Sequence, residues 1–265
     1  NLFRTVIILD VDQVSRVSIR QLADYLAMIT LAQVDPDADT GAYVSVLNVF
    51  DDPASTDGLS GWDEAYLHGL YEPVRIRRSP SAARSALSTS IHRARERLNT
   101  AADPPTEVTP QSPGDGATVT LGDVEVIARP RGDTVRAFVN EVAAPNRNRG
   151  IARWERDVCI GVANLRGAAA QFIVDRISAV ALEMGLTPGE PGCEANVIVI
   201  ASDSPDRVAE ELVNERLNVL IMGGSGMDQG RAALNAFAAS DRPVRWWQIS
   251  MPINSQTGVA AIRLP

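Results

Sequence analysis

The strongest constraint on the fold is a regular alternation of short apolar runs with amphipathic segments in the C-terminal half of the chain. The predicted strands are Val158–Ala163, Val197–Ala201, Val219–Met222 and Val244–Ile249, and the predicted helices between them are Gly167–Met184, Asp206–Asn214 and Asp228–Ala239. Short strands that alternate with helices form βαβ units and parallel sheets. We therefore expect a three-layer α/β domain with a mainly parallel sheet, flanking helices and an additional helical portion.

The two cysteines fit this pattern as a disulfide. Cys159 lies at the beginning of the first of these strands, and Cys193 lies in the loop before the second. In a βαβ unit both positions fall at the same end of the sheet, where the Cα atoms can approach the roughly 5.5 Å that a disulfide needs. The alternative is two unrelated buried thiols. A disulfide indicates an oxidising compartment, so we expect a periplasmic or secreted protein.

A metal site is not expected. The chain has only two histidines, His68 and His92, and both lie on predicted helices far in sequence from the cysteines. A structural zinc site needs four ligands of these types close together.

Residues 1–100 are predicted to hold several helices and one strand near residues 3–9, which can join the α/β domain. Ser18 with Gln21 is spaced as a capping box, and the segment around Ser60 is a second helix start. Tyr43–Phe50 fits either a strand or a short buried helix, because period alone does not separate the two.

The next segment, residues 101–116, is Pro-rich and acidic, which is typical of a linker or a disordered terminus. The predicted organisation is therefore a strand plus helical portion at 1–100, a linker at 101–116 and an α/β domain at 117–265.

The charge pattern excludes several functions. All 25 basic residues are arginine, so a Walker-type phosphate loop and Schiff-base chemistry, which both need lysine, are excluded. The net charge of −8 disfavours a nucleic-acid partner. No apolar run approaches the roughly 18 residues that span a bilayer, so we expect no transmembrane segment.

One segment is basic. It contains the candidate interaction residues Arg75, Arg77, Arg78, Arg93 and Arg97. A solvated helix face explains this pattern, and the alternative is contact with an acidic partner, such as a membrane surface or another subunit.

A Gly-rich turn is the main candidate for chemistry. Ser225 lies between an apolar run and a predicted helix, which is the context of a nucleophile elbow, but Met227 breaks the G-x-S-x-G pattern. The same turn could instead bind an anion at the helix N-terminus, through Gly223, Gly224, Ser225 and Gly226. The spacing of its glycines departs from the dinucleotide-binding fingerprint, so no cofactor is expected. The third interpretation is a simple tight turn.

Two further features have a structural and a functional interpretation. Trp246 and Trp247 are adjacent on a predicted strand, so they point to opposite faces; both can be core, or one can be exposed for stacking on a partner. Asp10 and Asp12 follow the first strand and resemble the first motif of haloacid-dehalogenase-like phosphotransferases. Carboxylates on a solvated loop at a strand end are the simpler explanation.

Several short motifs resemble an uncharacterised family of exported alphaproteobacterial proteins. They are Ala152-Arg153-Trp154-Glu155 with Val158-Cys159, Pro191-Gly192-Cys193 with Asn196-Val197, Arg242-Pro243-Val244-Arg245-Trp246, Gln21-Leu22-Ala23-Asp24-Tyr25, and Tyr66-Leu67-His68-Gly69-Leu70-Tyr71. The resemblance covers most of the chain. It implies export, but the family carries no established activity and no assigned catalytic residues.

The order of these motifs is reversed relative to the family. The part that resembles residues 152–250 precedes the part that resembles 21–71 in the family. One hypothesis is that the natural chain begins near Ala101 or Ala102 and that residues 1–100 are its C-terminal portion.

The sequence thus favours a non-enzymatic extracytoplasmic interaction or accessory protein of the cell envelope, whose partner is another envelope protein or subunit. No predicted constellation has a nucleophile, a base and an orienting group together. The competing hypothesis is a serine hydrolase built on Ser225.

Overall fold

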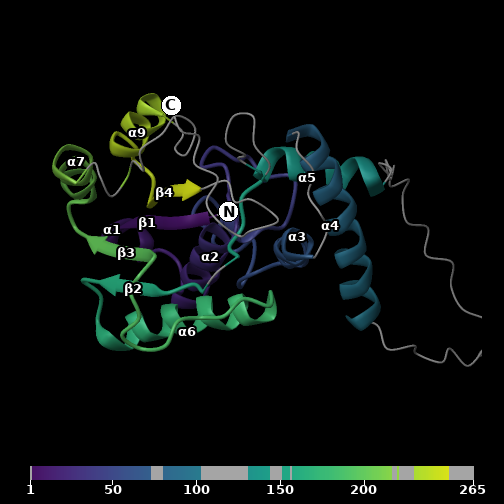
Figure 1. Cartoon of the computed structure of the whole chain (residues 1–265), viewed down its shortest axis with the longest axis horizontal. Coiled ribbons are helices and arrows are strands. Elements are labelled where there is room, and N and C mark those ends of the chain that lie inside the picture. The colour runs from purple at the N-terminus through teal and green to yellow at the C-terminus, as the bar shows by residue number, and fades with distance from the viewer. Residues whose placement is uncertain are drawn as a thin grey trace, which may run out of the picture.

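The computed structural model describes residues 2–72, 80–102, 131–143, 151–155, 157–216, 220 and 230–250 of the chain. Its centre is a four-stranded sheet (Figure 1). The strands are β1 (Leu2–Asp10), β2 (Ile160–Ala163), β3 (Val197–Ser202) and β4 (Val244–Ser250), arranged in the order β2-β3-β1-β4. β3 is parallel to both β1 and β2, whereas β4 is antiparallel to β1.

Helices cover both faces of this sheet, which confirms the expected three-layer α/β architecture. On one face lie α2 (Ile19–Leu31) and α6 (Gly167–Glu183), and on the other lie α7 (Pro205–Glu215) and α9 (Arg231–Ala238) (Figure 1). Successive residues of β1 point to opposite faces. Ile7 and Leu9 belong to the larger core with α2 and α6, while Val6 and Ile8 belong to the smaller core with α7 and α9.

The N-terminal strand β1 lies inside the sheet. Thr5 to Asp10 pair with residues 197–202 of β3, and the other edge of β1 pairs with β4. Residues from the predicted 1–100 and 117–265 parts therefore share one sheet and both hydrophobic cores. The structure confirms that the strand predicted near residues 3–9 joins the α/β domain, although an apolar run alone does not identify its neighbours.

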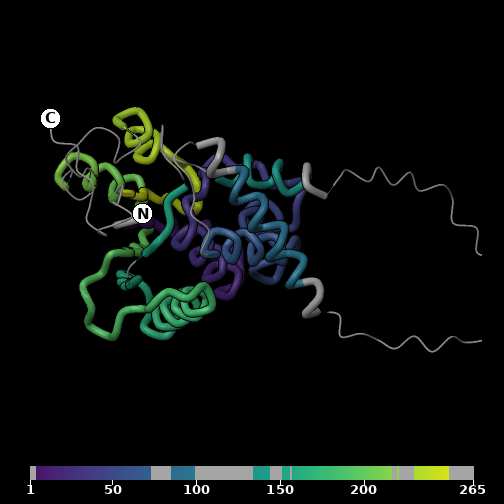
Figure 2. The backbone as a smooth tube through the Cα atoms, turned by 45° about the vertical axis from the view of Figure 1, so that its right-hand side comes forward, coloured from purple at the N-terminus to yellow at the C-terminus, as the bar shows by residue number. Residues whose placement is uncertain are grey.

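The predicted helical portion lies beside the sheet. Within residues 1–100 it consists of α3 (Gly61–Tyr71) and α4 (Pro80–Ala102). Helix α5 (Arg131–Val142), from the part predicted as the α/β domain, lies with them on one side of the molecule in Figures 1 and 2. An aromatic cluster packs α3 against α5: the Phe138 ring centroid lies 5.0 Å from those of both Tyr43 and Trp62.

Both predicted helix starts are confirmed as capping boxes. The Ser18 hydroxyl accepts from the Gln21 N–H at 3.2 Å, and the Gln21 side chain accepts from the Ser18 N–H at 2.9 Å. Ser60 and Asp63 make the same reciprocal pair at the start of α3.

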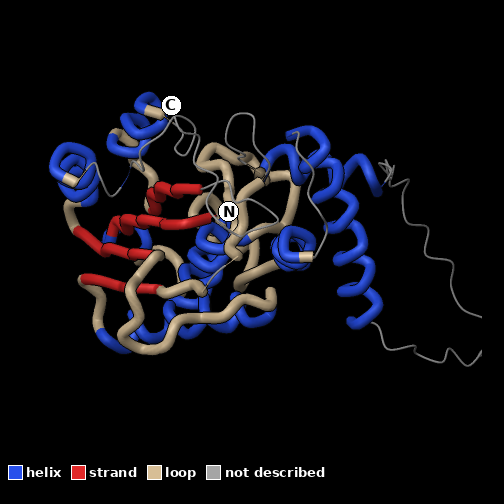
Figure 3. The backbone as a smooth tube through the Cα atoms, viewed as in Figure 1, coloured by secondary structure: helices blue, strands red, loops and turns tan. Residues whose placement is uncertain are grey.

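Two short elements complete the described chain. The ambiguous segment Tyr43–Phe50 forms neither a strand nor a longer helix, and contains the single 3-10 turn η1 (Val46–Asn48). The short helix α1 (Val11–Val14) follows β1 directly. Loops, drawn tan in Figure 3, connect α2 to α3 around η1.

Several sequence-based expectations lie outside the described residues. These include most of the linker at 101–116, the predicted strand Val219–Met222 apart from Leu220, and the Gly-rich turn after it. Leu220 is helical, so at this residue the strand prediction is wrong. Helix α4 runs continuously through Thr100 and Ala101, near which the reversed-order hypothesis places a natural chain start. That hypothesis stays a prediction, which intact-mass and N-terminal sequence measurements test.

Candidate functional site

The Cys159–Cys193 disulfide is present where the sequence placed it. The Cα atoms are 6.1 Å apart, and the bond joins the residue before β2 to the loop before β3. Asn196 fixes this corner, because its side chain accepts from the Cys159 N–H at 2.9 Å and donates to the Asp157 carbonyl at 2.8 Å. The corner is a structural brace at the amino end of the parallel strands.

The candidate interaction residues Arg93 and Arg97 both face Glu72. Their guanidinium groups lie 3.7 and 3.5 Å from the Glu72 carboxylate. The neighbouring Arg95 guanidinium lies 3.7 Å from the centroid of a Trp62 ring. These contacts explain the described part of the basic segment as packing between α3 and α4. Arg75, Arg77 and Arg78 lie outside the described residues, as do Gly223, Gly224, Ser225 and Gly226.

The tryptophan pair is buried. Trp246 and Trp247 are only 7% and 4% exposed, and they point into the larger and the smaller core, respectively. The predicted opposite orientation is correct. Their burial removes the alternative that one indole is exposed for stacking on a partner.

Asp10 serves as a helix cap. Its carboxylate accepts from the Asp12 and Gln13 N–H groups at 3.0 and 3.1 Å and from the Gln13 side chain at 2.8 Å. Burial raises its pKa, but these hydrogen bonds and the charge of Arg245 outweigh it and lower the pKa overall. These contacts are those of the N-cap residue of α1, which is a structural role for Asp10.

A pocket of about 840 Å³ is the feature that sequence analysis missed. It lies between the loop that follows α2, residues 36–55, and the loop that leads into β4, residues 241–244. The Pro243 carbonyl accepts from the Asp10 N–H at 3.0 Å, so the pocket lies near the carboxyl end of β1. Its size is within the range of small-ligand sites, and open α/β sheets bind ligands near the carboxyl ends of their strands.

Aromatic side chains line this pocket. Tyr25 comes from the middle of α2, and its ring makes edge contacts with Phe50 at 5.0 Å and with Trp246 at 6.2 Å. Phe50 and Tyr43 are also lining residues. Burial raises the pKa of the Tyr25 hydroxyl, Arg242 lowers it and Asp51 raises it further, so the hydroxyl stays protonated at neutral pH.

Acidic side chains dominate the rest of the pocket lining. The lining carboxylates are those of Asp37, Asp39, Asp51, Asp52 and Asp241, and all five residues are exposed. The one cationic lining residue, Arg242, forms an ion pair with Asp37. The pocket is therefore strongly negative, with its cation already paired.

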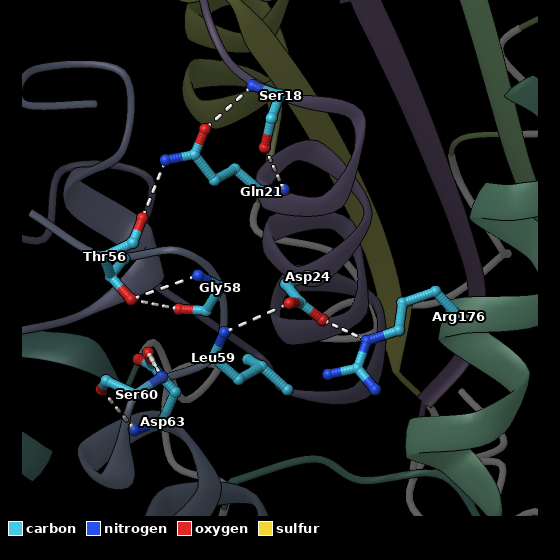
Figure 4. Close-up of polar contacts among 9 residues, drawn as sticks. All are labelled: Ser18, Gln21, Asp24, Thr56, Gly58, Leu59, Ser60, Asp63 and Arg176. Atoms are coloured by element: carbon cyan, nitrogen blue, oxygen red, sulfur yellow. Dashed lines mark hydrogen bonds and ion pairs between the residues drawn. The ribbon is translucent and has the colours of Figure 1, made fainter. Parts of the chain in front are cut away.

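A buried polar network holds the loop of residues 53–59, from which Ser55 lines the pocket, against α2 (Figure 4). The Gln21 amide donates to the carbonyls of Pro53 and Thr56 at 2.7 and 2.8 Å. One helical turn further on, the fully buried Asp24 carboxylate forms an ion pair with Arg176 of α6 and accepts from the Leu59 N–H at 3.3 Å. These contacts fix the loop of residues 53–59 against α2.

A close approach at Gly58 belongs to the same network. A Cβ atom at this position would lie 2.1 Å from Asp24 Oδ2. Only glycine lets the loop reach the buried carboxylate, because any side chain would overlap it. The spacing of Asp24 and Gly58 in sequence gives no sign of this contact.

A second network holds the other part of the loop. The Asp63 carboxylate accepts from the Ser45 hydroxyl at 2.6 Å and from the Val46 N–H at 2.8 Å. The Asn48 amide donates to the carbonyls of Thr40 and Tyr43, both at 3.0 Å. Burial raises the pKa of Asp63, and the hydrogen bonds from Ser45, Ser60 and Val46 lower it in part. The pocket is thus formed by loops with fixed conformations.

The pocket does not have the composition of a metal site or of a Ser–His or Cys–His catalytic centre. Among the described residues, no group of three or more histidine, cysteine, aspartate or glutamate side chains is placed to hold a metal ion. The described lining residues include neither histidine nor cysteine. His68 and His92 lie on α3 and α4, and His92 pairs with Glu96 at 3.4 Å.

No described helix is long and apolar enough to cross a membrane. Comparison of the chain with protein-family models, curated proteins and solved structures found no match.

Proposed function

We propose that this protein is a non-enzymatic interaction protein of an extracytoplasmic compartment, and that the acidic pocket is its binding site. The observation that carries the proposal is the pocket itself, in which aromatic and acidic groups lie on loops that buried side chains hold in place. Preorganised polar and aromatic groups in a cavity are typical of recognition sites.

The lining residues favour binding over nucleophilic catalysis. A hydroxyl nucleophile needs a base within hydrogen-bonding reach. The pocket contains the Thr40 and Ser55 hydroxyls, and Thr40 already bonds to the Asn48 side chain. Since no histidine lies among the described lining residues, neither hydroxyl has the usual base beside it.

The disulfide supports the proposed compartment. Such bonds persist in the periplasm and outside the cell and are rare in the cytosol. We propose a periplasmic or secreted location with another envelope protein or subunit as the partner. A nucleic acid fits poorly, because the five lining aspartates would repel its phosphates.

Labelling with a fluorophosphonate probe tests the non-enzymatic part of the proposal. We expect no labelling of the full chain. Covalent labelling of Ser225 that disappears in Ser225→Ala would overturn the proposal in favour of the hydrolase hypothesis.

Affinity capture from a native envelope fraction tests the binding part. A stoichiometric partner should be retained by the full chain and lost with Asp51→Asn/Asp241→Asn. The control Glu210→Gln removes one exposed charge on α7, across the sheet from the pocket, and should retain the partner. Equal capture by all three chains would show that the pocket is not the binding site.

A further inference from the structure

The uncompensated charge of the pocket indicates the sign of its ligand. Of the five lining aspartates, Asp37 is paired with Arg242, Asp39 accepts from the Gly41 N–H at 3.0 Å, and Asp52 accepts from the Ala54 N–H at 3.1 Å. Within the described part of the chain, the Asp51 and Asp241 carboxylates have no ion pair and no hydrogen bond. An anionic ligand would meet this negative charge without a free cation to bind it.

Tyr25 provides an independent indication of a ligand. This residue is 7% exposed, yet its hydroxyl makes no hydrogen bond to any described residue. The hydroxyl oxygen is not among the fully buried side-chain atoms that lack a partner, so it reaches the solvent in the pocket. The Tyr25 side chain lines the pocket, and the charges that act most strongly on its hydroxyl are those of Arg242 and Asp51, which line it too. A ligand with N–H donors would replace solvent as the hydrogen-bond partner of this hydroxyl.

The aromatic lining fits the same class of ligand. A guanidinium or ammonium group is attracted to the face of an aromatic ring within about 6 Å of its centroid. Tyr25, Tyr43 and Phe50 all line the pocket. Carboxylates around aromatic rings are a combination that favours organic cations over neutral apolar ligands.

We propose that the pocket binds an organic cation, a guanidinium or primary ammonium group, with Asp51 and Asp241 as the anionic partners and the Tyr25 hydroxyl as a hydrogen-bond acceptor. This inference rests on the proposed function and names the chemistry of its ligand. The cation is either an arginine or lysine side chain of a protein partner or a free small amine. Both have the same recognition chemistry.

Isothermal titration calorimetry of the full chain at about 20 mM ionic strength, where screening is weak, tests this proposal. The probes are N-acetyl-arginine methylamide, its lysine analogue, the free monocation propylguanidine, and N-acetyl-citrulline methylamide. Citrulline has nearly the shape of arginine but no charge. At least one cationic probe should bind about tenfold or more tightly than the citrulline compound.

Four variants locate the binding. Asp51→Asn and Asp241→Asn should each weaken binding of the cation about two- to fivefold, as expected for an exposed charge pair. Tyr25→Phe, which retains the ring, should weaken it between about two- and tenfold through the lost hydrogen bond. Glu210→Gln should bind as the original chain does. Urea unfolding curves of each variant show whether it is folded.

Tighter binding of the arginine or lysine amide than of propylguanidine supports the proposal and assigns the cation to a protein partner. The reverse supports the proposal and assigns the cation to a free small molecule. Equal binding of the citrulline compound, or cation binding that all three pocket variants leave unchanged, would overturn it. A failure of the cation-binding proposal is distinguishable from a failure of the proposed function. A chain that Ser225 labelling shows to be a hydrolase can still bind the cation, and an unlabelled chain can fail to bind it.

Discussion

Replacing Arg176 by methionine should lower the free energy of unfolding by about 3 kcal/mol. The Asp24 side chain is 0% exposed, and Arg176, itself 28% exposed, is its ionic partner. Removing one partner of a buried ion pair usually costs about 3–5 kcal/mol, because the remaining charge is buried without compensation. We expect the lower end of this range, because the Leu59 N–H, at 3.3 Å, still donates to the carboxylate.

The opposite change should cost less. Asp24→Asn leaves Arg176 without its partner, but the partly exposed guanidinium can turn toward water, and the asparagine oxygen can still accept from Leu59. We expect a loss of about 1–2 kcal/mol. The double variant Arg176→Met/Asp24→Asn should be more stable than Arg176→Met alone, because it leaves no charge buried.

Urea unfolding followed by tryptophan fluorescence measures these differences. Arg207→Met is the matched control: Arg207 is 76% exposed and pairs with Glu211 on α7, so its loss should cost less than about 0.5 kcal/mol. A loss below about 1 kcal/mol for Arg176→Met, or a double variant less stable than Arg176→Met, would contradict the account of this network.

Three further predictions concern other contacts. Gly58→Ala should cost about 2 kcal/mol through overlap with Asp24, whereas Gly61→Ala, where a Cβ meets nothing within 4 Å, should be neutral or slightly stabilising; equal unfolding midpoints would refute the steric argument. Reducing the disulfide, whose cysteines are 34 residues apart, should cost about 4 kcal/mol, seen as a lower urea midpoint in dithiothreitol; an unchanged midpoint would contradict it. Burial lowers the pKa of His68; Glu183 raises it and Arg97 lowers it, and the net effect in the folded chain is a lowered pKa. The unfolded chain therefore binds this proton more readily than the folded chain does. The free energy of unfolding should fall as the pH drops below about 6.5, the ordinary pKa of histidine. His68→Gln should reduce this slope, and identical slopes would exclude His68 as its source.

Much of the fold was predictable from local patterns. The alternation of apolar runs with amphipathic segments predicted the three-layer architecture, because this pattern is typical of βαβ units. The helix starts at Ser18 and Ser60 could be predicted because each capping box joins two residues that are only three positions apart in the sequence. The disulfide followed from the topology of a βαβ unit, which brings Cys159 and Cys193 to the same end of the sheet.

The pocket was not predictable in this way. Tyr25 lies on the same helix as core residues and has the same period, so sequence does not show that it lines a cavity. Asp51 and Asp241 come from loops almost at opposite ends of the chain, and only the antiparallel addition of β4 beside β1 brings these loops together. The burial of Asp24 depends on Arg176 and Gly58, two distant residues whose contact has no sequence signature.

A crystal structure of the full chain with N-acetyl-arginine methylamide tests the central claim most directly. The account predicts the guanidinium in the pocket, with nitrogen atoms about 2.8–3.0 Å from the carboxylate of Asp51 or Asp241 and from the Tyr25 hydroxyl. A guanidinium bound elsewhere, or one in the pocket beyond hydrogen-bonding distance of all three residues, would contradict it.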